Sequence, residues 1–440
     1  MLTAEQNERL TRVGPGTPGG ELLRRYWQPL APAASLVDKQ TLKVRLLGED
    51  LALFRDRSGK LGLVAELCPH RRCSLAYGVP EDNGIRCPYH GWLFDAEGNC
   101  LEQPAESPNS TFKDRIKTVS YPVVEVGGVF WAYMGPGEAP IFPRHDYLVQ
   151  ENTLRDIGVT MLPINWVQAM ENSLDPTHLE WLHMWYGYYN RTGQSHTDLG
   201  SFPQARHAKI GFDVTDYGIV KRRYYEGGSE EDHDWKIGHP VLFPNILKVG
   251  TGLQLRVIVD DTHILHMLYN TYSFEGVPAP HQDVVPTYEL PYQKADGTFD
   301  VSLIIQQDMM AWVTQGQIAD RTVEHLGGSD RGVMLYRKVF EENLRRIEAG
   351  EDPMFVYRDD DHADVINILV DTVEAAKEGL GFQRRRGEAE QILSREWAWM
   401  NDPDPAKMLE VLQQGQNRYS PIHQEIIDLR LAFLKTRGAA

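Results

Sequence analysis

Cysteine is scarce in this chain, with four in 440 residues. Four cysteines are too few for a disulfide framework, so disulfides are not what stabilises the fold. Long hydrophobic runs are missing as well. No stretch of about eighteen apolar residues occurs, so we expect neither a membrane-spanning helix nor a membrane partner. The N-terminal residues lack the apolar core of a secretory signal, and we therefore expect a cytoplasmic protein.

Positive charge is also in short supply. The chain has 45 Lys and Arg against 62 Asp and Glu, a formal net charge of −17 at pH 7. An acidic protein of this kind is a poor partner for nucleic acids or anionic membranes. Its apolar content of 42% is ordinary for a globular protein, and 440 residues are long for one core. We therefore expect two domains and no nucleic-acid partner.

Two of the four cysteines lie in short motifs that also contain histidine. Cys68 and His70 form the first motif, and Cys87 and His90 form the second. Two thiolates and two imidazoles can hold a [2Fe–2S] cluster, with the cysteine pair on one iron and the histidine pair on the other. A structural zinc ion is the alternative, but zinc fingers usually group the two cysteines and then the two histidines. The mixed order favours the cluster and predicts one-electron chemistry.

A second group of possible metal ligands lies further along the chain. His178 follows Asp175 by three residues, and His183 lies five residues after His178. An ideal helix places residues five apart about 140° around its axis. Both imidazoles can therefore reach one ion only if the helix is distorted, as a π-bulge would do, or if the ion sits over an edge that the two share. Without the cluster motif, histidines with no metal role would be an equally good interpretation, and Asp175 could simply cap a helix.

A mononuclear iron site for dioxygen typically has two histidines and one carboxylate. Asp308 lies near the start of an otherwise apolar helical run, where an ionised carboxylate needs a partner such as a metal. We favour it as the third ligand. Asp320 and the acidic residues between 360 and 364 are weaker candidates.

The cluster motifs carry a family resemblance. The segments CPHRRCSL at 68–75 and CPYHGW at 87–92 resemble the Rieske domain of the ring-hydroxylating oxygenases. Respiratory-chain Rieske proteins pair a cysteine at the position of Cys73 with a second one, and this chain has Tyr89 there. We therefore expect Cys73 to be a free, buried thiol. The resemblance implies these cluster ligands: Cys68, His70, Cys87 and His90.

The second group is similar to the mononuclear-iron motif of the same oxygenases. The resemblance implies that His178 and His183 bind Fe(II), and Asp308 matches the later carboxylate ligand of the family. It also implies a role for Asp175, which would link the iron site to a cluster histidine of a neighbouring subunit. The implied cofactors are thus a [2Fe–2S] Rieske cluster and a mononuclear Fe(II).

The predicted fold has two domains. Short alternating runs at 42–67 predict antiparallel strands, and Pro and Gly at 136–143 predict a linker. We expect an all-β Rieske domain followed by an α+β helix-grip catalytic domain, an antiparallel sheet with helices. The expected divisions are an N-terminal helical segment at 1–35, the Rieske domain at 36–145 and the catalytic domain at 146–440. Helices are predicted within these stretches: 167–189, 308–327 and 365–380.

The chain resembles the phthalate dioxygenase branch, and within it the lignin-biaryl O-demethylases. This implies the oxygenase component of a Rieske oxygenase that uses O₂ and NAD(P)H, through a separate ferredoxin or flavin reductase, to O-demethylate a methoxylated aromatic carboxylate. A phthalate-type ring dioxygenase forming cis-diols, or a ring hydroxylase of another aromatic acid, is the alternative. The branch also implies a homotrimer or a stacked pair of trimers.

A substrate carboxylate would need a cation near the iron. A predicted strand carries Lys221, Arg222 and Arg223, with Arg222 on one face and the other two on the opposite face. Any of the three could bind a carboxylate, and placement at the surface is the alternative. An electron-relay protein and a zinc hydrolase are further alternatives, but the second histidine pair argues against the first and the cluster against the second.

Overall fold

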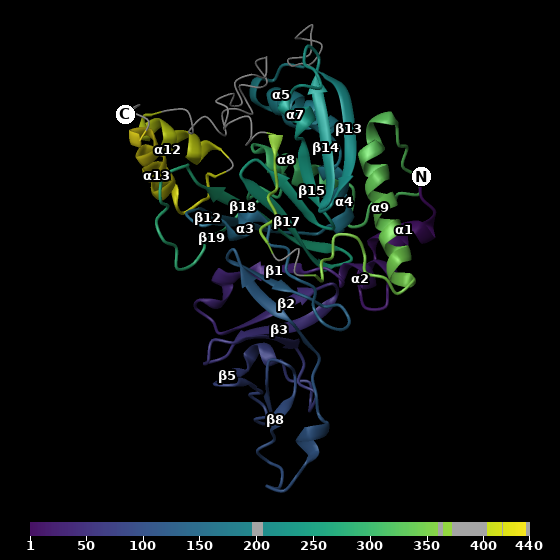
Figure 1. The fold of residues 1–440 in the computed structure, drawn as a ribbon, viewed down its shortest axis with the longest axis vertical. Coiled ribbons are helices and arrows are strands. Elements are labelled where there is room, and N and C mark those ends of the chain that lie inside the picture. The colour runs from purple at the N-terminus through teal and green to yellow at the C-terminus, as the bar shows by residue number, and fades with distance from the viewer. Residues whose placement is uncertain (196–205, 360–363, 372–402, 416, 437–440) are drawn as a thin grey trace.

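The computed structural model describes residues 1–195, 206–359, 364–371, 403–415 and 417–436. The molecule is elongated, with small β-sheets at its narrow end and one large sheet with helices at its broad end (Figure 1). The predicted order of a β-rich domain followed by an α+β domain is confirmed. A search of the described helices finds none that is long and apolar enough to cross a membrane.

Three small antiparallel sheets build the narrow end. One is ordered β1-β11-β10, the second β2-β3-β4-β9 and the third β5-β6-β7-β8. Their strands are β1 Gln28–Pro32, β2 Thr41–Leu46, β3 Glu49–Arg55, β4 Leu61–Ala65, β5 Val79–Glu81, β6 Gly84–Arg86, β7 Leu93–Phe94, β8 Cys100–Glu102, β9 Ser120–Tyr121, β10 Val123–Val126 and β11 Val129–Ala132. Three 3₁₀ turns accompany them: η1 Ala33–Leu36, η2 Leu75–Tyr77 and η3 Phe112–Arg115.

A small hydrophobic core stabilises the tip of this end. Phe54 and Phe94 are fully buried there, and Trp92 is 5% exposed. Cys68 and Cys87 belong to the same core. The two cysteine motifs therefore form loops after β4 and β6. The cysteine that begins each loop is buried in the small core, and the residues after it can face the solvent.

An eight-stranded sheet forms the centre of the broad end, in the order β13-β14-β15-β16-β17-β18-β12-β19. All neighbours are antiparallel except β12 and β19, which run parallel at one edge. The strands are β12 Leu154–Leu162, β13 His207–Thr215, β14 Gly218–Tyr225, β15 His239–Leu242, β16 Ile246–Val249, β17 Gly252–Asp260, β18 His263–Tyr272 and β19 Thr287–Glu289.

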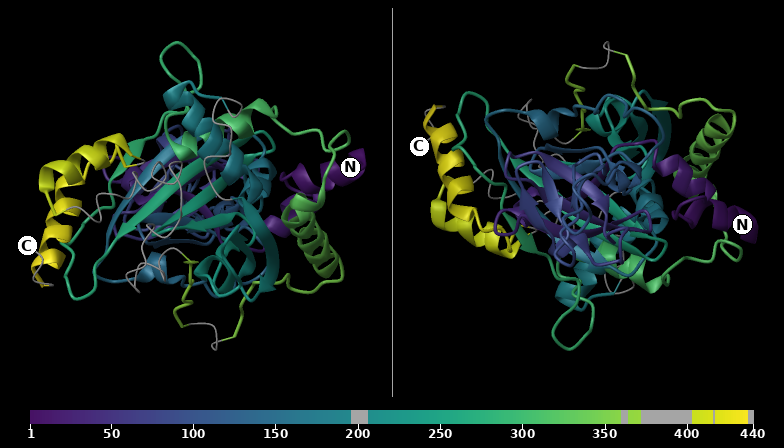
Figure 2. Two further views of the ribbon diagram at one scale, coloured as in Figure 1. Left: turned by 90° about the horizontal axis from the view of Figure 1, so that it is seen from above. Right: turned by 90° about the horizontal axis from the view of Figure 1, so that it is seen from below.

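Helices cover this sheet. Trp166 on α4 packs against Phe340 on α9, with ring centroids 5.8 Å apart, so α4 is enclosed between the sheet and α9. Figure 2 shows α12 and α13 on the opposite side of the sheet from α1 and α9. The helices are α1 Ala4–Thr11, α2 Pro18–Leu23, α3 Asp146–Val149, α4 Trp166–Ser173, the π-helix η4 Leu179–Tyr186, α5 Gly187–Thr192, α7 His233–Lys236, α8 Ile304–Thr314, the 3₁₀ turn η5 Gly328–Asp330, α9 Arg331–Glu348, α12 Pro405–Gln414 and α13 His423–Thr436.

Two of the helix predictions need correction. The helix expected at 308–327 is wrong in its extent, because α8 begins at Ile304 and ends at Thr314. Gly316 follows with a φ of +89°, a left-handed conformation that favours glycine and ends helices. Of the helix expected at 365–380, residues 365–370 are not helical, and 372–380 lie outside the described residues.

Candidate metal centres

The two cysteine motifs form loops with the same backbone design. The N–H of Arg72 donates to the carbonyl of Cys68 at 2.9 Å, and the N–H of Gly91 donates to that of Cys87 at 3.0 Å. Arg72 and Gly91 both have positive φ values, 62° and 74°. This conformation is uncommon for arginine, so the matching turn is a specific feature of both loops. It brings the four side chains of the two motifs together.

The thiols lie inside and the imidazoles lie outside. Cys68 and Cys87 are 1% and 3% exposed and lie within hydrogen-bond reach of each other. His70 and His90 lie nearer the surface with ring centroids 4.5 Å apart, and Trp92 stacks on His70. Burial raises the pKa of Cys68 to about 12, so its thiolate form needs a cation beside it. These donors fit a [2Fe–2S] cluster with its histidine-bound iron outermost.

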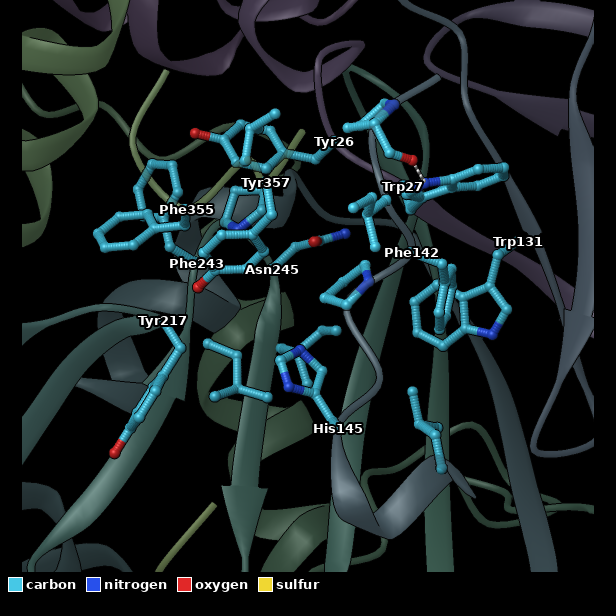
Figure 3. Close-up of a pocket in the computed structure, with 18 residues that line it drawn as sticks. Tyr26, Trp27, Trp131, Phe142, His145, Tyr217, Phe243, Asn245, Phe355 and Tyr357 are labelled. Carbon is cyan, nitrogen blue, oxygen red and sulfur yellow. Dashed lines mark hydrogen bonds between the residues drawn. The ribbon is translucent and has the colours of Figure 1, made fainter. Parts of the chain in front are cut away.

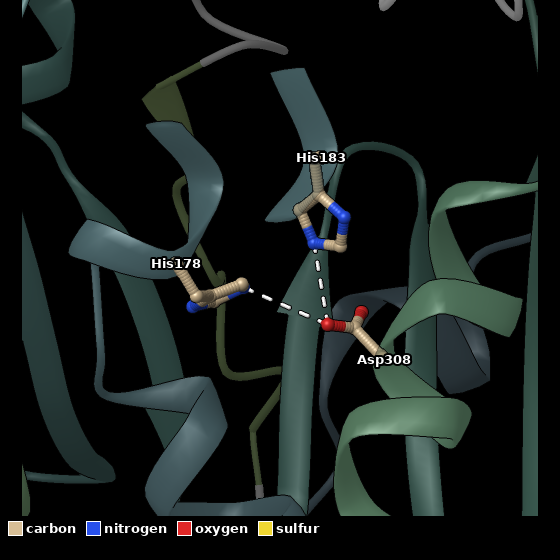
Figure 4. Close-up of side chains that lie close together, drawn as sticks. All are labelled: His178, His183 and Asp308. Carbon is tan, nitrogen blue, oxygen red and sulfur yellow. Dashed lines mark ion pairs between the residues drawn. The ribbon is translucent and has the colours of Figure 1, made fainter. Parts of the chain in front are cut away.

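His178, His183 and Asp308 converge in the broad domain (Figure 4). His178 Nε2 lies 3.7 Å and His183 Nε2 lies 3.2 Å from the same oxygen, Asp308 Oδ1. The helix that joins the histidines is a π-helix, Leu179–Tyr186, which is one of the two arrangements that the five-residue spacing allowed. Its i→i+5 hydrogen bonding places residues five apart on nearly the same face. Asp308 comes from the neighbouring α8.

Neighbouring side chains orient these donors. His183 Nδ1 lies 3.0 Å from Gln307 Oε1, and Gln307 Nε2 donates to the carbonyl of Val301. The amide oxygen therefore accepts from Nδ1–H, which leaves the lone pair of His183 on Nε2, toward Asp308. On the other ring, His178 Nδ1 faces Asp175 Oδ2 at 3.7 Å. Both histidines thus direct Nε2 into the space that they share.

The carboxylate of Asp308 is ionised. The residue is 5% exposed, and burial by itself would raise its pKa. The two histidines and the amide of Asn172, which donates to Oδ1 at 3.3 Å, outweigh burial and lower the pKa. One carboxylate and two imidazoles around a small space fit a divalent iron with open coordination positions.

Sequence reasoning missed the contacts that hold the π-helix in place. Glu180, between the two histidines, is 6% exposed and accepts the backbone N–H of His207 at 2.7 Å. It also binds the ring of His207. This pair joins the π-helix to the start of β13. An acidic residue inside the apolar run LEWLHMWY was the only available signal.

The three cationic candidates on β14 have different surroundings. Arg222 binds Asp213 and donates to the carbonyls of Trp235 and Lys236. Lys221 and Arg223 lie on the other face of the strand, each 6% exposed. The alternation predicted for this strand is therefore present.

The other acidic candidates lie apart from the three converging donors. Asp320 is bound to Thr322 in an exposed turn. Asp364 is exposed, and residues 360–363 lie outside the described residues.

An aromatic-lined pocket elsewhere contains none of the predicted site residues (Figure 3). It lies where the N-terminal segment meets β15, β16 and the chain near 355–357. His145 projects into it and is neutral, because burial lowers its pKa to about 4. The pocket has a volume of about 40 Å³, which is room for a few water molecules and too little for an aromatic substrate.

Comparison with known proteins decides the family. Residues 26–122 match the Rieske [2Fe-2S] domain, and residues 293–366 match a LigXa C-terminal-like domain. The chain is 42% identical over 366 residues to the 5,5'-dehydrodivanillate O-demethylase oxygenase subunit of Sphingobium sp. (strain NBRC 103272 / SYK-6). That match covers 82% of this chain and 84% of the relative. The chain belongs to the Rieske non-heme iron oxygenases.

Other Rieske oxygenases agree with this result. The phthalate 4,5-dioxygenase oxygenase subunit of Pseudomonas putida is 32% identical over 392 residues, covering 80% of this chain and 88% of that protein. Among solved structures, the NdmA QL mutant of Pseudomonas putida CBB5 with caffeine has a TM-score of 0.56 at 18% identity and covers 78% of this chain and 99% of its own. At that identity the likeness shows the fold alone.

Membership in the family confirms several predictions. The protein is the oxygenase component of a Rieske oxygenase, an oxidoreductase whose cofactors are a [2Fe–2S] cluster and a mononuclear iron. It takes its electrons from a separate protein, as such components do. The relay-protein and zinc-hydrolase alternatives are thereby excluded.

Proposed function

We propose that this Rieske oxygenase O-demethylates a methoxylated aromatic carboxylate. The observation that carries the proposal is 42% identity over 82% of the chain to an oxygenase subunit named for dehydrodivanillate O-demethylation. The LigXa-like match at 293–366 spans α8, which bears Asp308. Ring dioxygenation is the second candidate, favoured by the relatives named for phthalate and phenoxybenzoate at 32% and 33% identity.

The proposal assigns seven ligands. Four hold the cluster, namely Cys68, His70, Cys87 and His90, and three hold the iron, namely His178, His183 and Asp308. When bound, the ferrous ion supplies the centre at which dioxygen is activated. The protein contributes orientation: Gln307 keeps the proton of His183 on Nδ1, and Asn172 holds the carboxylate of Asp308 in place. The reaction is ArOCH₃ + O₂ + 2e⁻ + 2H⁺ → ArOH + HCHO + H₂O.

We infer that electrons cross between subunits of a homotrimer or a stacked pair of trimers. Figure 1 places β5 and β8, beside the cluster loops, at the opposite end of the molecule from α8. One chain therefore holds its two centres apart. The side chain of Asp175 adjoins His178 and remains 28% exposed, so a neighbouring subunit can reach it. A ferredoxin or flavin reductase supplies the electrons.

Two further parts of the proposal concern organisation. We place the domain boundaries near residues 35 and 145. The gap between β11 and β12 supports the second, whereas β1 at Gln28–Pro32 already pairs with β11 of the Rieske domain and so lies before the first. We place the protein in the cytoplasm. None of the four cysteines forms a disulfide, which suits a reducing compartment.

A substrate panel tests the reaction. Purified protein with a reductase and NADH is given 5,5'-dehydrodivanillate, 3-methoxybenzoate and phthalate, while oxygen uptake and formaldehyde are recorded together. We expect one formaldehyde for each O₂ consumed with a methoxylated acid and none with phthalate. Conversion of phthalate to a cis-diol, without formaldehyde from either methoxylated acid, would establish the ring dioxygenase instead.

Replacing Asp175 by asparagine is expected to slow turnover about 10- to 100-fold while both metal centres stay occupied. A neutral amide cannot hold a charged contact with His178 Nδ1, so the electron path is disturbed and the ligands are not. The measurement is the rate at which substrate and O₂ oxidise a pre-reduced cluster in a single turnover. Asp320→Asn, in an exposed turn, is the control. Loss of iron from Asp175→Asn would show a purely structural role.

A further inference from the structure

Four basic side chains gather on the inner face of β13, β14 and β15. They are His207, Lys221, Arg223 and His239. Burial is the main cause that lowers the pKa of both histidines, and the charges of Arg223 and Lys221 lower it further. Lys221 and His239 are direct partners in the β14–β15 register. Burying several basic groups together is costly unless each one has an anionic or hydrogen-bonding partner.

Three of these groups have a carboxylate partner. Glu180 binds the ring of His207, Asp371 Oδ1 lies 2.9 Å from His239 Nδ1, and Asp234 Oδ1 lies 3.5 Å from Arg223 Nε. Lys221 differs from them. Within the described part of the chain, its ammonium has no carboxylate at ion-pair distance and no hydrogen bond, although the residue is only 6% exposed.

Lys221 lies on β14, which pairs with β13, and the contact between His207 and Glu180 joins β13 to the π-helix that bears His183. Asp175 and Asp308 are close enough to act on it electrostatically, but both are engaged with His178 and His183. Burial, with Arg223 adding to it, lowers the pKa of Lys221 to about 7. The ammonium therefore gains most from an anion that enters the site from outside the protein.

We propose that Lys221 binds the carboxylate of the aromatic substrate and so orients its ring beside the iron. This rests on the proposed function, because the anion is a group of the methoxylated acid. An ammonium donates up to three hydrogen bonds, and a carboxylate accepts them as charge-assisted bonds. Arg223 cannot serve as well, since Asp234 already faces it. Arg222 is directed to the opposite face of β14.

The test compares an acid with its ester in binding rather than in turnover. Oxidised, iron-loaded holoenzyme without reductant is titrated calorimetrically with 5,5'-dehydrodivanillate and with its dimethyl ester, and likewise with 3-methoxybenzoate and its methyl ester. Wild-type protein is expected to bind at least one acid roughly tenfold to hundredfold more tightly than the matching ester. Lys221→Met is expected to abolish that preference, and Lys221→Arg to retain most of it.

The matched control is Arg222→Met, which removes a cation from the same strand on the other face and is expected to leave the preference unchanged. Iron content is measured in each variant so that affinities are compared at equal loading. Wild-type protein that prefers no acid over its ester overturns the proposal without any variant. So does a Lys221→Met protein that keeps the preference. A preference for phenolic over non-phenolic probes, shared by acids and esters, would assign Lys221 to a phenolate instead.

These outcomes are separable from those of the reaction itself. Formaldehyde release from a methoxylated arene without acid preference would leave the demethylase proposal intact and refute the role of Lys221. Acid preference lost in Lys221→Met, together with cis-diol formation and no formaldehyde, would retain the anion site and refute demethylation.

Discussion

Replacing Asp308 by alanine is expected to lower the iron content from three atoms per chain to two and to reduce product formation by more than about 100-fold. The cluster accounts for two of the atoms and the mononuclear site for the third. Asp308 is the one carboxylate among the three donors that converge, and the other two, His178 and His183, are imidazoles. Metal analysis, the EPR signal of the reduced cluster and product formation are measured on one preparation.

The cluster signal separates the two centres in that experiment. It is expected to persist in Asp308→Ala, because the cluster loops belong to a different core. Asp320→Asn serves as the matched control, since Asp320 follows the same helix but lies in an exposed turn. Full iron content and wild-type turnover in Asp308→Ala would remove Asp308 from the ligand set.

Replacing Cys87 by serine is expected to remove the cluster altogether. Iron content should fall from three atoms per chain to one, and the visible absorption and EPR signal of the cluster should disappear. Turnover with reductase and NADH should then be undetectable, since the proposed path delivers the reductase's electrons to the cluster first. Cys87 is 3% exposed and packed beside Cys68, so a serine hydroxyl cannot replace the thiolate.

Two companion variants make this result specific. Cys73→Ser is expected to keep the cluster, because Tyr89 occupies the position of a disulfide partner and the thiol of Cys73 is in no disulfide, although it is only partly buried and not buried as predicted. His90→Cys is expected to keep a cluster of lower reduction potential, as thiolate replaces imidazole on the outer iron. Cluster loss in Cys73→Ser, or its survival in Cys87→Ser, would contradict the assignment.

Candidate ligands for both centres could be proposed from the sequence because most of them lie close together along the chain. Cys68 and His70 share one loop, and local turn geometry is enough to bring such neighbours together. The spacing of His178 and His183 predicted either a distorted helix or an ion over a shared edge, and the structure contains a π-helix at Leu179–Tyr186. Asp308 was suggested by its own chemistry, since a carboxylate in an apolar helix needs a partner.

The side chains that contact these candidate ligands could not be identified from spacing along the chain. Gln307 meets His183, and His207 meets Glu180, across elements that only tertiary packing brings together. An amide or an imidazole in a sequence gives no sign of which group it will contact. The end of α8 was also misjudged, although Gly316 marked it locally.

The sequence by itself determined the two kinds of metal site, the two-domain order and the alternation of Lys221, Arg222 and Arg223 on one strand. Only the tertiary structure decided which face of that strand lies beside the iron ligands and which cation already has a carboxylate partner. The physical reason is that alternation along a strand is local, whereas charge pairing depends on neighbouring elements. The order of the eight-stranded sheet, with β12 inserted between β18 and β19, was likewise decided by packing among segments distant in the chain.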